Sequence, residues 1–186
     1  MTRQARSIPD AASPSLDRPI RVLFVCTANS ARSILAEALL RARGGFDFEV
    51  HSAGTEPKGI HPLTLRVLTE AGIPTAELRS TSVDEYRGRR FDYVITVCDR
   101  ARQVCPVFPG EHTSLHWDYE DPAAVEGSEV DRLAAFRETL LAMDEQIERF
   151  VTLAREAPGK GGSATSSDRA AMTRPTGAGE LAHRAR

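Results

Sequence analysis

The sequence lacks any long hydrophobic run, since no stretch approaches the roughly 20 apolar residues that a membrane span requires. The first twenty residues are polar, contain three prolines and have no apolar core like that of a secretory signal. Aromatic residues make up only 6% of the 186 residues, yet hydrophobic residues reach 41% and charged residues 27%, as in an ordinary globular protein. We therefore expect a cytoplasmic protein that does not interact with membranes.

Cysteine is also scarce. The chain has three cysteines, Cys26, Cys98 and Cys105, with no CxxC pair and no close cluster of cysteine and histidine. The odd number argues against a disulfide-stapled secreted fold, and the spacing argues against a structural zinc site. We predict no tightly bound cofactor and, apart from the potassium candidate described below, no bound metal. Each cysteine is then either a buried apolar residue or a reactive thiol.

Hydrophobic periodicity is missing from both ends of the chain. Residues 1–18 and 157–186 are polar and irregular, and we expect them to be disordered tails on either side of one domain, residues 19–156. The formal net charge is -2, and because both tails are basic the negative charge falls on the domain. An acidic domain is unsuited to nucleic acid, so we expect no nucleic-acid partner. We also expect a monomer.

Between the tails, sequence patterns of strands and helices alternate. Strands are predicted at residues 20–25, 46–51, 91–97 and 115–117, where short apolar or β-branched runs occur. Helices are predicted at residues 30–43, 62–71 and 133–154, where apolar residues recur every three or four positions. This alternation predicts an α/β domain in which helices flank both faces of a four-stranded parallel sheet.

The segment CTANSARS links the first predicted strand to the first predicted helix. It consists of Cys26, Thr27, Ala28, Asn29, Ser30, Ala31, Arg32 and Ser33. Ligands of open α/β folds bind at this edge of the sheet, and unpaired N–H groups at a helix N-terminus favour anions. Five residues between Cys26 and Arg32 can wrap around a tetrahedral oxyanion, with backbone amides pointing inward and Arg32 closing the ring. We call residues 26–33 the oxyanion loop.

The positive field of this loop predicts a reactive thiol. It should lower the pKa of Cys26 and favour the thiolate, to which Ser33 can donate a hydrogen bond. Asn29 can hold the loop in a left-handed backbone conformation, which Asn tolerates better than most residues. The loop therefore combines a nucleophile with groups that bind an oxyanion.

An Asp121-Pro122 pair lies in the loop before the last predicted helix, although from spacing alone it is often just a turn. The blocks RVLFVCTANSARS, HSAGTEPKGIHPLTLRVL, FDYVITVCDRARQVCP and HWDYEDPA resemble, in order and spacing, the low-molecular-weight protein tyrosine phosphatase superfamily. The resemblance is closest to its thioredoxin-coupled arsenate reductase branch. It implies that Cys26 is the nucleophile, that Arg32 binds the oxyanion, and that Asp121 is the general acid protonating the leaving oxygen.

The resemblance also implies a role for the other two cysteines. Cys26 would attack arsenate, Cys98 would attack Cys26 and release arsenite, and Cys105 would attack Cys98, leaving a Cys98–Cys105 disulfide for thioredoxin. If residues 98–105 formed one helix, the two Cα atoms would lie about 10 Å apart, whereas a disulfide requires roughly 4.4 to 6.8 Å. We therefore predict that residues 99–104 unwind on oxidation. From the sequence alone, Cys98 could instead be a core residue, with Cys105 a coincidence.

Some reductases of this type hold a monovalent cation, and Asn29, Glu37 and Ser52 lie at matching positions. Potassium is therefore a candidate ligand beside arsenate or phosphate, although these side chains can equally form structural hydrogen bonds. Ala123 and Ala124 stand where phosphatases of the family usually have an aromatic residue, which disfavours an aryl substrate. The alternative functions are a phosphatase acting on phosphotyrosine or another phosphomonoester, and a non-catalytic oxyanion-binding regulatory module.

Overall fold

The computed structural model describes residues 18–156, so both predicted tails, except Arg18, lie outside the described residues. The strands are β1 (Ile20–Cys26), β2 (Phe48–Gly54), β3 (Tyr93–Thr96) and β4 (Thr113–His116). The α-helices are α1 (Arg32–Gly44), α2 (Pro62–Glu70), α3 (Asp99–Val104) and α4 (Glu129–Glu156). The short 3-10 helices are η1 (Gly45–Asp47), η2 (Val83–Tyr86) and η3 (Pro122–Ala124). Arg18 forms an ion pair with Asp92 at 2.7 Å, which ties the start of the described chain to the segment before β3.

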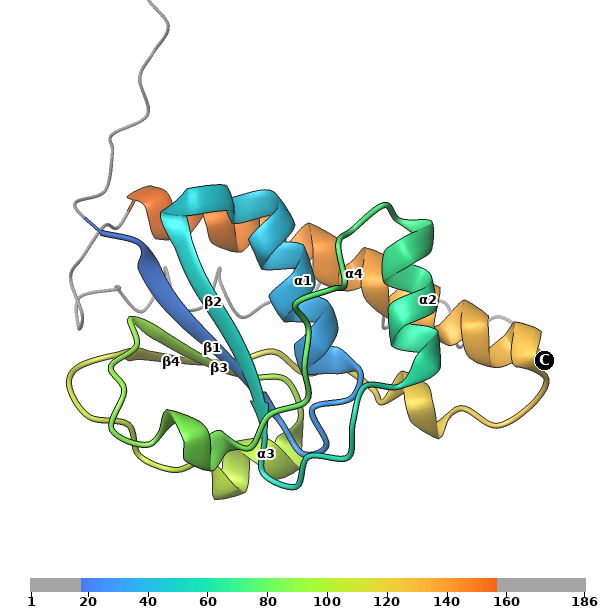
Figure 1. Cartoon of the computed structure of the whole chain (residues 1–186), viewed down its shortest axis with the longest axis horizontal. Helices are drawn as coiled ribbons and strands as arrows, with labels where there is room; N and C mark the ends of the chain where they lie inside the picture. Colours follow the sequence, from blue (N-terminus) through green and yellow to red (C-terminus); the bar gives the residue numbers. More distant parts are fainter. Residues whose placement is uncertain (1–17, 157–186) are drawn as a thin grey trace, which may run out of the picture.

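The four strands form one parallel sheet in the order β2-β1-β3-β4, which confirms the predicted four-stranded parallel sheet. β1 lies near the centre, with Val22 opposite Val50 of β2 and Tyr93 of β3. Only Arg21 of β1 is exposed, because both faces of the sheet are covered, and this explains why the strand is a continuous apolar run. Since the strands are parallel, their carboxyl ends share one edge of the sheet, where the ends of β1 and β2 lie near α3 (Figure 1).

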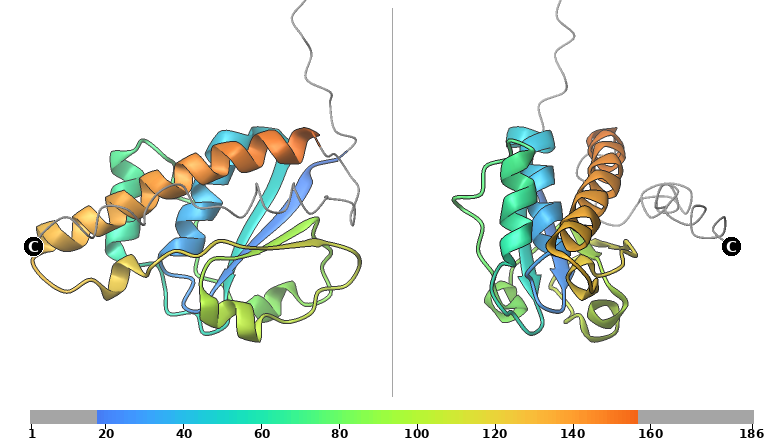
Figure 2. Two further views of the ribbon diagram at one scale, coloured as in Figure 1. Left: turned by 180° about the vertical axis from the view of Figure 1, so that it is seen from behind. Right: turned by 90° about the vertical axis from the view of Figure 1, so that its right-hand side faces the viewer.

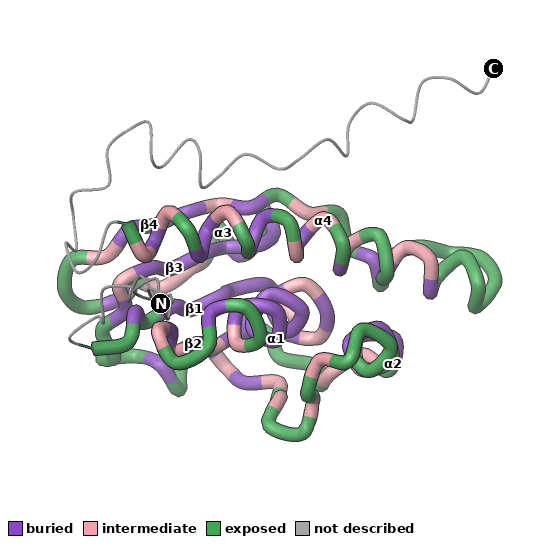
Figure 3. The backbone as a smooth tube through the Cα atoms, turned by 90° about the horizontal axis from the view of Figure 1, so that it is seen from above, coloured by how far each residue is buried: buried purple, intermediate pink, exposed green. Residues whose placement is uncertain are grey.

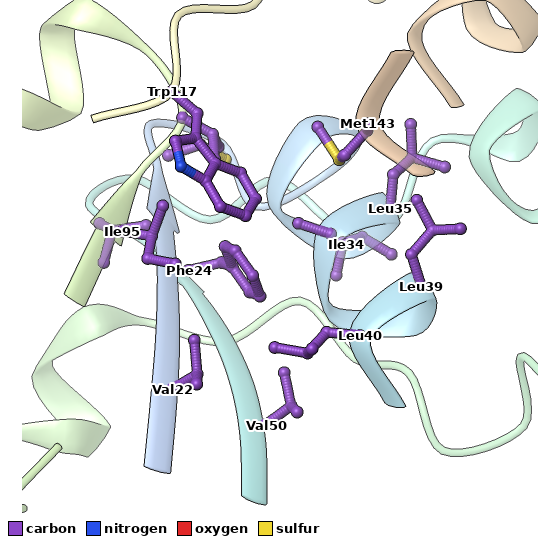
Figure 4. Packing of buried hydrophobic residues seen from close by; sticks show 14 of the residues in the cluster. Val22, Phe24, Ile34, Leu35, Leu39, Leu40, Val50, Ile95, Trp117 and Met143 are labelled. Carbon is purple, nitrogen blue, oxygen red and sulfur yellow. The ribbon is translucent and has the colours of Figure 1, made fainter. Parts of the chain in front are cut away.

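Helices α1 and α4 pack against each other, and α1 also contacts β1 and β2. Figure 4 shows Phe24 of β1 and Val50 of β2 pointing toward Ile34 and Leu40 of α1. All four side chains are buried, as the apolar stripe of α1 predicts. The main hydrophobic core therefore lies between the sheet and the α1–α4 pair.

Aromatic rings cover both faces of the sheet. On the core face, Phe150 of α4 lies 5.0 Å from Tyr93 of β3, measured between ring centroids. His51 points from β2 to the opposite face, where its ring centroid lies 5.2 Å from that of Tyr86 in η2. The rings of Tyr86 and Phe91 are in turn 6.0 Å apart. Short segments, rather than long helices, therefore complete the second face.

Local sequence signals explain where two helices begin. Pro62 is the first residue of α2, as predicted, and the His61 side chain caps that helix by accepting a backbone N–H hydrogen bond at 3.1 Å. α4 begins before its apolar stripe because Ser128 and Asp131 exchange hydrogen bonds as a capping box. Six-residue α3 has no apolar periodicity, since it is shorter than two full turns, and the sequence patterns did not predict it.

The long helices leave the carboxyl ends of the strands to loops and to the short helix α3. α4 runs along the length of the domain (Figure 2), and α2 lies beyond α1, away from the sheet (Figures 1 and 3). No helix in residues 18–156 combines the length and the apolar character that crossing a membrane would require. The oxyanion loop, α3 and the segment after β4 meet at the carboxyl edge of the strands, where the candidate site lies.

Candidate active site

The oxyanion loop is held by the segment that follows β2. Backbone N–H groups within residues 55–61 bind four loop carbonyl groups, at 2.8–3.2 Å: those of Cys26, Thr27, Ala28 and Ser30. Because these carbonyls face outward, the N–H groups of the loop are left to face its interior. One of them, the N–H of Asn29, donates to Cys26 Sγ at 3.0 Å. The loop thus directs a backbone donor at the sulfur.

The N-terminus of α1 lies against this loop without a side-chain cap. Ala31 occupies the N-cap position, where Ser, Thr, Asp or Asn would bind the N–H groups of the first turn, and it makes no such bond. The first turn contains no acidic residue. Its N–H groups and the helix dipole are therefore available to an anion, with Arg32 adding a positive charge beside them.

The sulfur of Cys26 is buried, with 3% of the residue exposed, and it is placed to accept two hydrogen bonds. Besides the Asn29 N–H, its partner is Ser33 Oγ at 2.9 Å. Asn29 Nδ2 donates to Ser33 Oγ at 2.8 Å, so the hydroxyl proton of Ser33 is left to point at the sulfur. The orientation of the Asn29 amide is fixed, because its Oδ1 accepts the backbone N–H of Thr81 at 2.6 Å. The network is therefore arranged to accept a thiolate.

The backbone conformation of Asn29 and the pKa of Cys26 can both be compared with the predictions from the sequence. Asn29 adopts a φ of 43°, which confirms the predicted left-handed conformation. Burial raises the pKa of Cys26, and the hydrogen bonds from Ser33 and Asn29 lower it without offsetting burial in full. The predicted lowering of the pKa is therefore wrong. The prediction counted the positive field of the loop but not the loss of solvent around a sulfur at the buried end of β1.

Replacing Ser33 with alanine is expected to slow alkylation of Cys26 by iodoacetamide about 10-fold, because a hydrogen bond to a charged group contributes about 1.5–3 kcal/mol. Loss of the donor raises the pKa of Cys26 further, so less thiolate is present at neutral pH. Mass spectrometry of the Cys26 peptide over time gives the rate. Ser114→Ala, on the exposed side of β4, is the matched control. Equal alkylation rates for Ser33→Ala and wild type would show that Ser33 does not stabilise the Cys26 thiolate.

Gly54, the last residue of β2, lies directly beneath the oxyanion loop. A Cβ atom there would lie 2.7 Å from the Thr27 carbonyl oxygen and 3.0 Å from the Asn29 backbone nitrogen. Both are backbone atoms, so the loop itself would have to shift. The sequence did not reveal this contact, which depends on the register between β1 and β2.

Gly54→Ala is expected to destabilise the domain by about 1–3 kcal/mol and to weaken phosphate binding about 10-fold or more, as the ring of N–H donors is displaced. Denaturant unfolding and calorimetric phosphate titration measure the two effects. Gly88→Ala is the comparison, because Gly88 has a φ of +84° but no neighbours within 4 Å of a new Cβ. That variant should lose stability and keep its phosphate affinity. The same phosphate affinity in both variants would contradict the predicted contact.

A cavity of about 450 Å³ opens above the loop. Its lining includes Cys26, Arg32 and Asp121, so the structure brings together the three residues singled out for oxyanion chemistry. The Arg32 guanidinium donates to Asp121 Oδ2 and to the carbonyl oxygen of Tyr119, each at 2.9 Å. The loop before α4 thus holds the arginine over the cavity, and an arriving anion would compete with that loop for the same guanidinium.

The other two cysteines lie at the two ends of α3. Cys98, at the N-cap position, is buried at the edge of the same cavity, and its Sγ is 3.5 Å from Thr27 Oγ1. Cys105, at the C-cap position, is partly exposed, and burial raises its pKa. All three cysteines are free thiols in the structure. Six helical residues between the caps imply a Cα separation of about 10 Å, so the segment predicted to unwind, residues 99–104, is α3.

Asn29, Glu37 and Ser52, the candidate potassium ligands, lie together and are hydrogen-bonded to one another. Asn29 Nδ2 donates to Ser52 Oγ at 2.8 Å, and Ser52 Oγ donates to Glu37 Oε2 at 2.5 Å. The Asn29 side chain thus presents nitrogen rather than oxygen to the other two. Glu37 is also paired with Arg41 at 2.5 Å, which already supplies a positive charge. These three residues satisfy one another as a structural hydrogen-bond chain.

Sequence reasoning missed several residues around the cavity. Lys58 and Arg100 add positive charge to its lining, and Tyr119, two residues before Asp121, also lines it. The Tyr119 hydroxyl donates to the Ala142 carbonyl of α4 at 3.4 Å, and burial raises its pKa well above the ordinary value. The Gly- and Pro-containing stretch after β2 was a usable signal for Lys58, because that stretch begins at the same sheet edge as the oxyanion loop.

Comparison with known proteins places these features in one family. Residues 21–158 match the model of the low molecular weight phosphotyrosine protein phosphatase family. An arsenate reductase of Halalkalibacterium halodurans is 34% identical over 129 residues, which cover 69% of this chain and 93% of that protein. Two solved structures are similar as well.

One is a thioredoxin-dependent arsenate reductase of Corynebacterium glutamicum, with 33% identity and a TM-score of 0.57. That match covers 74% of this chain but only 64% of the Corynebacterium protein, less than two thirds of its length. The other is an arsenate reductase of Archaeoglobus fulgidus, with 32% identity and a TM-score of 0.58, covering 70% of this chain and 98% of that one. By sequence and by structure, the chain belongs to the low molecular weight phosphotyrosine protein phosphatase family.

Proposed function

We propose that the chain is an enzyme that reduces arsenate to arsenite, with electrons from an external dithiol of the thioredoxin class. The observation that carries the proposal is the presence of two thiols, Cys26 and Cys98, in the lining of one oxyanion-binding cavity. Hydrolysis of a phosphate ester uses one thiol. Reduction of As(V) to As(III) takes two electrons, which two thiols supply when they become a disulfide. The similar arsenate reductases support the same function.

In the first step, arsenate occupies the oxyanion loop, bound by backbone N–H groups and by Arg32, which leaves its ion pair with Asp121. The Cys26 thiolate attacks arsenic and forms an S–As bond. One arsenate oxygen leaves as water after taking a proton from Asp121, whose carboxyl group is set free by the movement of Arg32. Arsenic remains As(V) throughout this step.

In the second step, the Cys98 thiolate attacks Cys26 Sγ. The S–As electron pair passes to arsenic, which leaves as As(III) arsenite, and a Cys26–Cys98 disulfide forms. In the third step, Cys105 attacks Cys98 and returns Cys26 as a thiolate, while α3 unwinds to allow the Cys98–Cys105 disulfide. Thioredoxin then reduces that disulfide. Because the cycle depends on reduced thiols, we place the chain in the cytoplasm.

Phosphomonoester hydrolysis is a second candidate function. Cys26, Arg32 and Asp121 are the complete set for that reaction, and phosphate shares the shape and charge of arsenate. The presence of Cys98 in the cavity is the observation that ranks reduction first, since hydrolysis has no use for it. We expect hydrolysis as a side activity of the loop.

The test is arsenate-dependent oxidation of NADPH in the presence of thioredoxin and thioredoxin reductase, with p-nitrophenyl phosphate hydrolysis measured on the same protein. Oxidation that requires arsenate, thioredoxin and the chain together would support reduction. Efficient ester hydrolysis with no arsenate reduction from any thiol donor would make the chain a phosphatase. Absence of both activities, with phosphate binding retained, would favour a non-catalytic oxyanion-binding module.

A further inference from the structure

We propose that Asp99, His116 and Asp118 form a binding site for a divalent transition metal ion of the zinc class. One ligand atom from each side chain lies within 4.8 Å of the other two. Asp99 begins α3, His116 ends β4 and Asp118 follows two residues later, so the carboxyl edge of the sheet brings them together. The proposed reaction uses none of these side chains.

The hydrogen bonds of His116 show which ring nitrogen is available. Thr96 Oγ1 donates to the Leu115 carbonyl at 3.3 Å, and the same oxygen lies 2.9 Å from His116 Nδ1. With the Thr96 proton on the carbonyl, Nδ1 carries a hydrogen and donates it to Thr96, and this tautomer is part of the proposal. The neutral ring then has its lone pair on Nε2, on the side of the two aspartates. This second-shell bond is the arrangement that orients metal-binding histidines.

His116 Nε2 is the unusual atom of the cluster. It is enclosed by protein and has no hydrogen-bond partner among the described residues, yet Asp99 Oδ1 lies only 3.2 Å away. A ring lone pair and a carboxylate oxygen repel at this distance unless a proton or a metal ion lies between them. Two ligands bound to tetrahedral zinc at about 2.0–2.1 Å lie about 3.3 Å apart, so the observed spacing fits a shared metal ion.

The donor set and its exposure also fit such an ion. One imidazole nitrogen and two carboxylates are common zinc ligands, and their two negative charges balance a divalent cation. The Asp99 and Asp118 side chains are exposed and line the same cavity as Cys26, which gives the ion a path from solvent. Because Asp99 directly follows Cys98, a metal held here would fix the first turn of α3 to the end of β4.

The test uses the full-length chain with all three cysteines replaced by serine, because free thiols bind the same metals. Co²⁺ is titrated while its visible absorption is recorded, and Zn²⁺ is then added as a competitor. We expect one Co²⁺ per chain, displaced by Zn²⁺. His116→Ala and Asp118→Asn should each weaken Zn²⁺ binding 10-fold or more, and Thr96→Val by about 10-fold, because it removes the second-shell partner.

His112→Ala is the matched control, since His112 is partly exposed just before β4 and lies outside the cluster. It should leave Zn²⁺ affinity unchanged. Melting curves establish that each variant is folded, and exposed Asp118 can be replaced without disturbing the core. The proposal is overturned if the cysteine-free chain binds neither ion, as expected if only a proton lies between His116 and Asp99. It is also overturned if His116→Ala and Asp118→Asn bind Zn²⁺ as tightly as their parent.

Discussion

Replacing Cys98 with serine is expected to abolish arsenate turnover with thioredoxin while hydrolysis of p-nitrophenyl phosphate is retained. In the proposed cycle Cys98 supplies the sulfur that attacks Cys26, and a serine hydroxyl can neither form a disulfide nor give up the two electrons that arsenic needs. The hydrolytic groups lie in the oxyanion loop and at Asp121, and they do not depend on Cys98. NADPH oxidation and ester hydrolysis, measured on one preparation, give both rates.

Two further cysteine variants divide the cycle into steps. Cys26→Ser should lose both activities by a factor of about 10⁴ or more, because it removes the nucleophile common to both reactions. Cys105→Ser should release arsenite once per chain and then stop with a Cys26–Cys98 disulfide, which mass spectrometry detects. Arsenate turnover by Cys98→Ser at the wild-type rate would show that the reduction uses Cys26 with an external thiol alone.

Replacing Arg32 with alanine is expected to lower kcat/KM for both arsenate reduction and ester hydrolysis by a factor of about 10³, as for the loss of a donor aimed at developing charge. Arg32 is 14% exposed and is the cation that begins α1 beside the ring of loop amides. Its planar guanidinium can bind two oxyanion oxygens at once. Arg32→Lys keeps the charge but loses that geometry, and it should fall between wild type and Arg32→Ala.

Arg100→Ala is the control for a general loss of positive charge. Arg100 also lines the cavity, but it is 67% exposed and paired with Glu56 at 2.8 Å, so its charge is well screened. It should affect kcat/KM only slightly, and mainly at low salt. The role assigned to Arg32 would fail if Arg32→Ala were no more impaired than Arg100→Ala.

The sequence predicted the parts of the fold in which local pattern and tertiary packing agree. β1 is apolar on both faces because it lies inside a parallel sheet, and α1 has an apolar stripe because it packs on that sheet. The loop between them is also short enough to be recognised in one segment. For the same reason, Cys26 and Arg32 could be assigned to one site before the structure was known.

The remaining features depend on contacts between distant segments. The pairing of Arg32 with Asp121 spans 89 positions, and the close approach of Gly54 to Thr27 depends on strand register. Burial decides the direction of the Cys26 pKa, and burial is a property of the assembled sheet edge. Helix α3 has too few residues to show a helical repeat of apolar positions, and its formation depends on where the end of β3 places it in the fold.

Because Cys98 and Cys105 lie at the two caps of α3, the oxidation state of this cysteine pair and the conformation of α3 change together. In the proposed cycle α3 cannot stay helical while Cys98 and Cys105 form a disulfide. Each two-electron oxidation or reduction of this pair therefore also changes the surface that the segment presents. A reductant that binds only the unwound segment would recognise the oxidised chain before it reacts with the disulfide. Once the electrons are delivered, the helix re-forms and removes the surface that the reductant recognised, so that delivery terminates itself.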